Sequence, residues 1–76
     1  MATMSENLLS RITLNQEILG GKPIVRGMRI SVAMILELLA KGAMMPEILK
    51  DYPELEMADI YATLLHRQWR ANHESI

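Results

Sequence analysis

The apolar residues of segment 32–39 recur at the period of an α-helix, and this pattern constrains the fold more than any other feature. One helical face is formed by residues at i, i+3, i+4 and i+7, namely Val32, Ile35, Leu36 and Leu39. Ser31 is a suitable N-cap, and Gly42 is a suitable C-terminal stop. Met34 and Leu38 add a second apolar stripe, so this helix should be covered on more than one side.

Two further helices are expected after it. The first runs from about Pro46 to Tyr52, since proline is tolerated in a first helical turn and Pro53 disfavours helical geometry at the residue before it. The second runs from Glu56 or Met57 to Ala71, after the short connection "YPEL". A short helix, a tight turn and a longer helix form the layout of a helix-turn-helix.

The segment before the first helix is extended and interrupted by turns. "RITLNQEIL" alternates partly, as a short strand does, and "GGKPIVRGMRI" follows it at residues 20–30. Its structural turn residues are Gly20, Gly21, Pro23 and Gly27. It lacks the GxxxxGK[ST] pattern of a phosphate-binding loop.

The predicted fold class is therefore mainly α: a three-helix, helix-turn-helix bundle of homeodomain-like or winged-helix-like type, with a short N-terminal β-hairpin or β-arm. Residues 1–10 are expected to be a flexible tail, residues 11–72 one domain, and residues 73–76 a C-terminal tail. We expect a cytoplasmic protein with no membrane partner, because the chain has no long apolar run, no signal-peptide pattern and no cysteine.

The size of the chain predicts a homodimer. A domain of 76 residues buries little core, yet half of its residues are apolar and no disulfide can form. A second copy of the chain is the simplest way to cover the apolar surface that this small core leaves exposed. The net charge of −1 gives no general attraction to nucleic acid, so DNA binding would need a local basic patch.

Lys22, Arg26 and Arg29 are the candidate nucleic-acid contacts, since each could neutralise a phosphate without reading sequence. The alternative interpretation is structural: Arg26 or Arg29 anchors the arm through a carboxylate, for which Glu37 is a candidate. The start of the last helix argues against DNA binding, because it contains three carboxylates, Glu54, Glu56 and Asp59, and no cation. This start is either a solvated acidic surface that complements the helix dipole, or a surface for a basic partner.

A partner interface is predicted from the apolar second stripe, the methionines at element boundaries and the cationic end of the last helix. Its residues are Met34, Leu38, Met44, Met45, Met57, Arg67 and Arg70. Methionine adapts to irregular contacts, although it also fills gaps in a small core. Arg67 and Arg70 also complement the helix dipole.

Catalytic, cofactor and metal sites are not expected. The chain has no cysteine, no serine in a strained turn and no His–Asp pairing. His66 and His73 share a stripe with Arg70 between them, which repels a metal ion.

The segments "GGKPIVRGMRI", "SVAMILELLAKG", "EILKDYPEL" and "ADIYATL" together resemble the bacterial domain-of-unknown-function family numbered 433, over residues 12–66. The resemblance implies a small helix-turn-helix or winged-helix-like domain, regarded in many members as an antitoxin found beside a PIN-type nuclease toxin. Met28 stands where the family generally has threonine. Met44 and Met45 replace a capping serine or threonine and a proline, and Glu56 replaces a capping threonine. Each changed cap should cost about 1 kcal/mol.

These observations predict a non-enzymatic binding protein that is antitoxin-like and sequesters a PIN-like nuclease toxin. The alternative is a DNA-binding transcriptional regulator, which could control its own operon through backbone contacts of the basic arm. A third hypothesis is a structural assembly module. Salt separates the first two, because phosphate contacts weaken steeply with salt and apolar contacts do not.

Overall fold

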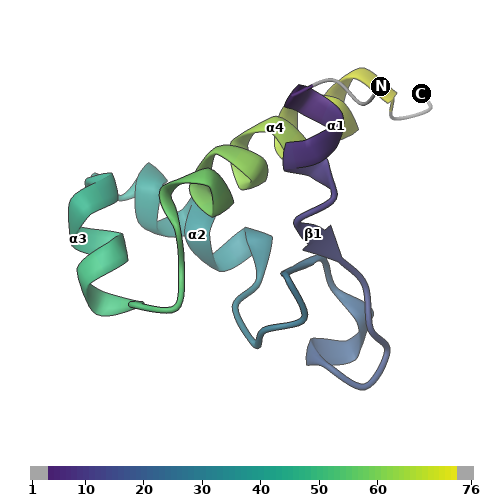
Figure 1. Cartoon of the computed structure of the whole chain (residues 1–76), viewed down its shortest axis with the longest axis horizontal. Helices are drawn as coiled ribbons and strands as arrows, with labels where there is room; N and C mark the ends of the chain where they lie inside the picture. Colours follow the sequence, from purple (N-terminus) through teal and green to yellow (C-terminus); the bar gives the residue numbers. More distant parts are fainter. Residues whose placement is uncertain (1–3, 74–76) are drawn as a thin grey trace.

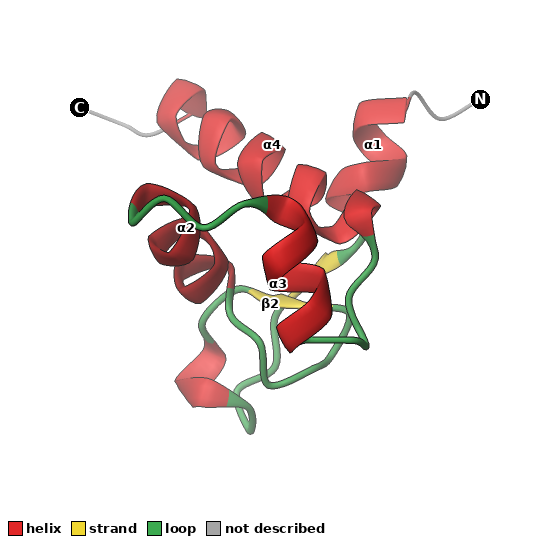
Figure 2. Ribbon diagram, turned by 90° about the vertical axis from the view of Figure 1, so that its left-hand side faces the viewer, coloured by secondary structure: helices red, strands yellow, loops and turns green. Residues whose placement is uncertain are grey.

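The computed structural model describes residues 4–73, and within them the chain is mainly helical with one small antiparallel sheet (Figure 1). The elements in order are α1 (Met4–Leu9), β1 (Ile12–Thr13), the 3-10 turn η1 (Leu19–Gly21), β2 (Ile24–Val25), α2 (Val32–Ala40), α3 (Met45–Asp51) and α4 (Met57–His73). The three predicted helices are thus confirmed as α2, α3 and α4. Figure 2 shows α3 in front, with β2 at its level and the loops of the arm that holds β1 and β2 extending below.

Local side-chain contacts explain where these helices begin. The Ser31 hydroxyl accepts the backbone N–H of Met34 at 3.0 Å, so Ser31 is the N-cap of α2, as predicted. At the end of α2, Gly42 has a φ of 98°, which glycine adopts readily. The N-cap of α3 is Met44, whose side chain makes no cap hydrogen bond. The Glu47 carboxylate instead accepts the Met44 backbone N–H at 2.9 Å.

The arm is a two-stranded antiparallel pairing with Ile12 opposite Val25 and Thr13 opposite Ile24. Gly27 stabilises the turn that follows β2, because its N–H donates to the Thr13 hydroxyl at 3.0 Å. The carbonyl of Pro23 accepts the N–H of Val32 at 3.0 Å. The arm is therefore joined directly to the first residue of α2.

Two of the turn glycines stand where a side chain would be strained. Gly21 has a φ of 83°, and a Cβ there would lie 2.8 Å from the Gln16 side chain. Gly27 has a φ of 72° beside Arg26, itself at a φ of 44°. Backbone sterics favour glycine in this region of φ, which agrees with its use at these turns.

Residues 4–9 form α1, whereas the sequence predicted a flexible tail over residues 1–10. The helix packs against α4, with Leu8 and Leu9 half-buried. The N–H of Arg11 closes its end by donating to the Leu8 carbonyl at 3.0 Å. A helix of six residues is too short to be stable alone or to show a clear period, so the contact with α4 is what forms it.

The core lies where α2, α3 and α4 meet the arm. Its buried residues are Val25, Ile30, Ile35, Ile48, Leu55 and Ile60. Met28, Met34, Leu38 and Met45 pack against this cluster and are partly buried. On α4 the buried face also includes Asp59, Ala62 and Thr63. Leu64, which the helical period placed beside Ile60, is 37% exposed.

Candidate functional site

A groove runs between α2 and α4 on the surface of the helical layer. It consists of two adjoining hollows of about 310 and 630 Å³, and Ala33, Leu36 and Arg67 line both. We call this surface the α2–α4 groove. It is open because small side chains, Ala33 and Ala40 on α2 and Ala71 on α4, line it.

The smaller hollow of the groove has an apolar floor and a basic edge, whereas the larger hollow is lined by both Glu37 and Arg67. In the smaller hollow the floor includes Pro23, Val32 and Leu36, whereas His66, Arg67 and Arg70 supply its polar lining from α4. Burial, and secondarily the charge of Arg70, lowers the pKa of His66 below its ordinary value of 6.5. His66 is therefore neutral at pH 7, and the positive charge of this edge comes from the two arginines.

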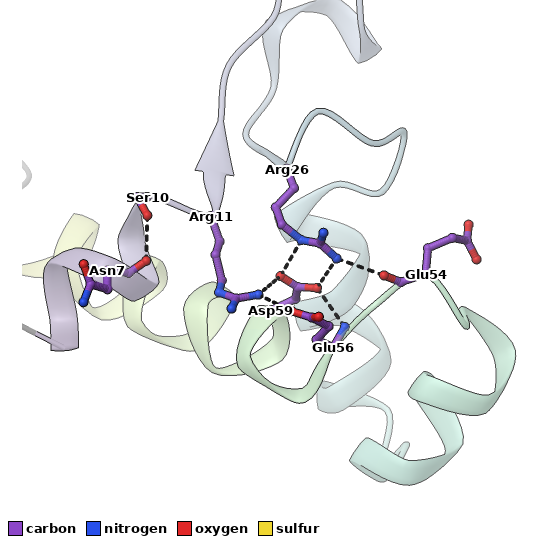
Figure 3. Close-up of polar contacts among 7 residues, drawn as sticks. All are labelled: Asn7, Ser10, Arg11, Arg26, Glu54, Glu56 and Asp59. Atoms are coloured by element: carbon purple, nitrogen blue, oxygen red, sulfur yellow. Dashed lines mark hydrogen bonds and ion pairs between the residues drawn. The ribbon is translucent and has the colours of Figure 1, made fainter.

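A second cluster surrounds Asp59, whose side chain is fully buried at the start of α4 (Figure 3). Arg26 donates to both of its carboxylate oxygens, from Nε at 3.0 Å and from Nη2 at 2.8 Å. Arg11 donates from Nη1 at 2.9 Å, and the backbone N–H of Glu56 at 2.8 Å. This last bond caps α4, because the Asp59 carboxylate takes up an N–H that the helix leaves unpaired.

The charge of Asp59 is stabilised by these donors. Burial alone raises the pKa of Asp59, but the hydrogen bonds from Arg26, the Glu56 amide and Arg11 together lower it by more, so the net shift is downward from 3.8. The ionised carboxylate joins three segments that are distant in sequence. Arg11 lies between α1 and β1, Arg26 follows β2, and Glu56 precedes α4.

Arg26 was a candidate both for a nucleic-acid contact and for a structural anchor of the arm, and this cluster shows that it is an anchor. Its guanidinium binds Asp59 and also donates to the Glu54 carbonyl at 2.9 Å, so Arg26 anchors the arm. Glu37 was the wrong partner, since it pairs with Lys41 at 3.1 Å on α2. The prediction that Asp59 belongs to a solvated acidic surface is also wrong.

Lys22 and Arg29, the other two predicted nucleic-acid contacts, are exposed. Neither side chain makes a hydrogen bond or ion pair within residues 4–73, although the backbone N–H of Lys22 donates to the Leu19 carbonyl at 3.4 Å. The structure therefore separates the three cations into one anchor and two surface groups.

The residues predicted for a partner interface do not gather on one face. Met34, Leu38 and Met45 pack against the core, whereas Met44 and Met57 are 67% and 48% exposed at the starts of α3 and α4. Only Arg67 and Arg70 of this set line the α2–α4 groove. The groove residues that the sequence did not single out are small or half-buried, such as Ala33 and Leu36, and no local pattern distinguishes them.

Sequence reasoning also missed Arg11 as a functional contact of Asp59. One signal was present, because Asp59 stands three residues after the helix N-cap, where a carboxylate can accept the N-cap N–H. Its neighbour Ile60 belongs to the buried face. An acidic residue at that position and beside that face is a candidate for a buried ion pair.

Two further properties of residues 4–73 bear on the kind of site. No group of three or more histidine, cysteine, aspartate or glutamate side chains there is arranged to hold a metal ion. No helix in the same residues has the length and apolar character needed to cross a membrane.

Comparison with known proteins identifies the family. The family described as "Protein of unknown function (DUF433)" matches residues 12–65, so this chain belongs to the DUF433 family. Its structure is similar to the crystal structure of a DUF433 member protein from Anabaena variabilis, with a TM-score of 0.77 and 25% sequence identity. The similarity covers 88% of this chain and 66% of that one. No curated protein matches the sequence.

Proposed function

We propose that this protein is a non-enzymatic binding module that receives a partner protein in the α2–α4 groove. The observation that carries the proposal is the combination, in the smaller hollow, of an apolar floor with a basic edge formed by Arg67 and Arg70. Hydrophobic grooves of this kind accept the apolar face of a partner helix, while charged groups at the edge set its orientation.

The family resemblance suggests the class of partner. An antitoxin-like role would have the groove bind a PIN-like nuclease toxin, and such nucleases hold their catalytic metal with carboxylates. Arg67 lines both hollows of the groove, so it is well placed to meet an acidic partner surface. An arginine paired with those carboxylates would block metal binding, which accounts for inhibition without any chemistry by this chain.

The test is whether the tagged protein captures a nuclease-like partner from native cell extract. The nucleic acid in the extract is first digested, so that a partner cannot be held through DNA or RNA. Ala33 is exposed on the groove, so Ala33→Glu should place a charge there without disturbing the core. Lys50→Gln is the matched control, because it also lowers the net charge by one, at an exposed position on α3.

Wild type and Lys50→Gln should retain a nuclease-like protein in stoichiometric amount and inhibit its cleavage of RNA. Ala33→Glu should lose both capture and inhibition. If wild type retains no protein, or if Ala33→Glu captures the nuclease as well as wild type, the groove is not the binding site.

The alternative function is DNA binding through the exposed cations of the arm, Lys22 and Arg29. The order of α3, a short turn and α4 would then act as a helix-turn-helix, which could also serve regulation of its own operon. Against it, α4 carries no cation before Arg67, although recognition helices contact DNA through their N-terminal residues. DNA affinity that falls steeply with salt, and that Lys22→Ala and Arg29→Ala both weaken, would favour this function.

A further inference from the structure

The solvent-facing side of α4 carries a regular stripe of side chains. Its members are Met57, Tyr61, Leu64, Gln68 and Ala71, which are all exposed. The intervals between them are 4, 3, 4 and 3 residues, the spacing of the contact positions in a two-helix coiled coil. Four of the five are apolar or aromatic, so the stripe has the pattern of a helix that packs against another helix.

The described part of the chain covers this α4 stripe only in part. Met57, Tyr61 and Leu64 are 48%, 46% and 37% exposed although α1, α2 and α3 all pack against α4. The sequence repeat continues over about 21 Å, at 1.5 Å for each of the 14 residues from position 57 to position 71. A partner helix is therefore needed along almost the whole length of α4.

Charge along α4 identifies the partner. Near the start of α4, Glu54 is an exposed carboxylate, and Glu56 is 62% exposed although it pairs with Arg11 at 2.7 Å. Residues 60–73, by contrast, contain Arg67 and Arg70 and no carboxylate. A second α4 that runs in the opposite direction would place its acidic end beside this basic end. A parallel α4 would instead place like charges side by side, which is unfavourable.

We propose that α4 packs antiparallel against α4 of a second copy of this chain, with the two Leu64 side chains meeting at the two-fold axis. Leu64 is the centre of the stripe, since it lies seven residues from both Met57 and Ala71. Each Met57 then lies against Ala71 of the second copy. Tyr61 lies close to Arg67 of that copy, a pairing in which a cation can rest on an aromatic face.

The pairing uses one surface on both copies, as a two-fold interface requires. It goes beyond the proposed function, because the partner is a second copy of this chain, and it shares Arg67 with the α2–α4 groove. Leu64 and Ala71 also line the α2–α4 groove, so the second copy would lie along the edge of each groove.

Disulfide cross-linking tests the geometry directly, because the natural chain contains no cysteine. Leu64→Cys should form a cross-linked dimer readily under oxidation. Met57→Cys alone should cross-link no faster than Lys50→Cys, which measures random collisions of an exposed α3 residue. A mixture of Met57→Cys and Ala71→Cys chains should cross-link to each other.

Two outcomes would overturn the proposal. Self-cross-linking of Met57→Cys as fast as that of Leu64→Cys would indicate parallel helices. Rates for Leu64→Cys and for the mixture no higher than that of Lys50→Cys would show that the α4 stripes do not meet.

Sedimentation equilibrium supplies a readout that needs no cysteine. Wild type and Lys50→Gln should sediment at twice the chain mass of 8.6 kDa, and Tyr61→Glu should sediment at the chain mass with an unchanged circular dichroism spectrum. A wild type that sediments as a monomer does not pair through the α4 stripe, and this result overturns the inference. A monomer that still captures the nuclease overturns the pairing alone, whereas a dimer that captures none overturns the proposed function alone.

Discussion

Asp59 is the residue at which the arm, the end of α1 and the start of α4 are joined. Arg26 and Arg11 both reach it from exposed or half-exposed positions, so losing either guanidinium leaves a buried carboxylate with fewer donors. Arg26→Ala should therefore lower the melting temperature, whereas Arg29→Ala should leave it unchanged. Thermal unfolding followed by circular dichroism measures both, and equal losses for the two variants would contradict the assignment of Arg26 as the anchor.

Acid stability should depend on the same residue. The pKa of Asp59 in the folded state lies below its ordinary value of 3.8, so the folded protein holds the ionised form more strongly than the unfolded chain does. This contribution is present above pH 4 and is lost as the pH falls through the folded pKa.

Asp59→Asn should accordingly lower the free energy of unfolding at pH 7 by about 2–3 kcal/mol. The difference from wild type should shrink toward pH 2. Urea unfolding across this range measures it, and a difference that stays constant with pH would show that the charge of Asp59 is not what stabilises the fold.

At the scale of elements, α3 is a helix that begins without a side-chain cap from its own N-cap residue. Met44 is its N-cap but makes no side-chain cap bond, and only the Glu47 carboxylate closes the turn. Met44→Ser should raise the free energy of unfolding by about 0.5–1 kcal/mol, because a hydroxyl can accept a further N–H of the first turn. Met44 is 67% exposed, so little core packing is lost. Chemical denaturation measures the gain, and Lys50→Ser is a control for adding a serine to α3.

For the whole molecule, the proposed pairing links stability to concentration. A small domain that folds as a dimer gains stability by mass action, so its melting temperature rises with protein concentration. We expect this rise for wild type and not for Tyr61→Glu. Calorimetry over a wide concentration range measures it, and a concentration-independent wild type would indicate that each copy folds alone.

The local parts of this structure could be predicted from the sequence because local interactions determine them. The helical period and the Ser31 cap place α2, and Pro46 and Pro53 bracket α3. The Gly-rich arm and the DUF433 assignment also follow from residues that are close together in the chain. Each of these depends on backbone preferences or hydrogen bonds over a few positions, which a sequence shows directly.

The contacts between distant segments were decided only by the tertiary structure. Arg26 lies 33 positions from Asp59, and Arg11 lies 48 positions away, so separation along the chain did not identify Asp59 as their shared partner. The helix α1 forms because it packs on α4, not because six residues favour a helix. The α2–α4 groove likewise exists because two helices pack side by side with alanines between them. The spacing of apolar residues in the sequence indicates which face of a helix is apolar. Only tertiary packing decides which apolar face remains uncovered.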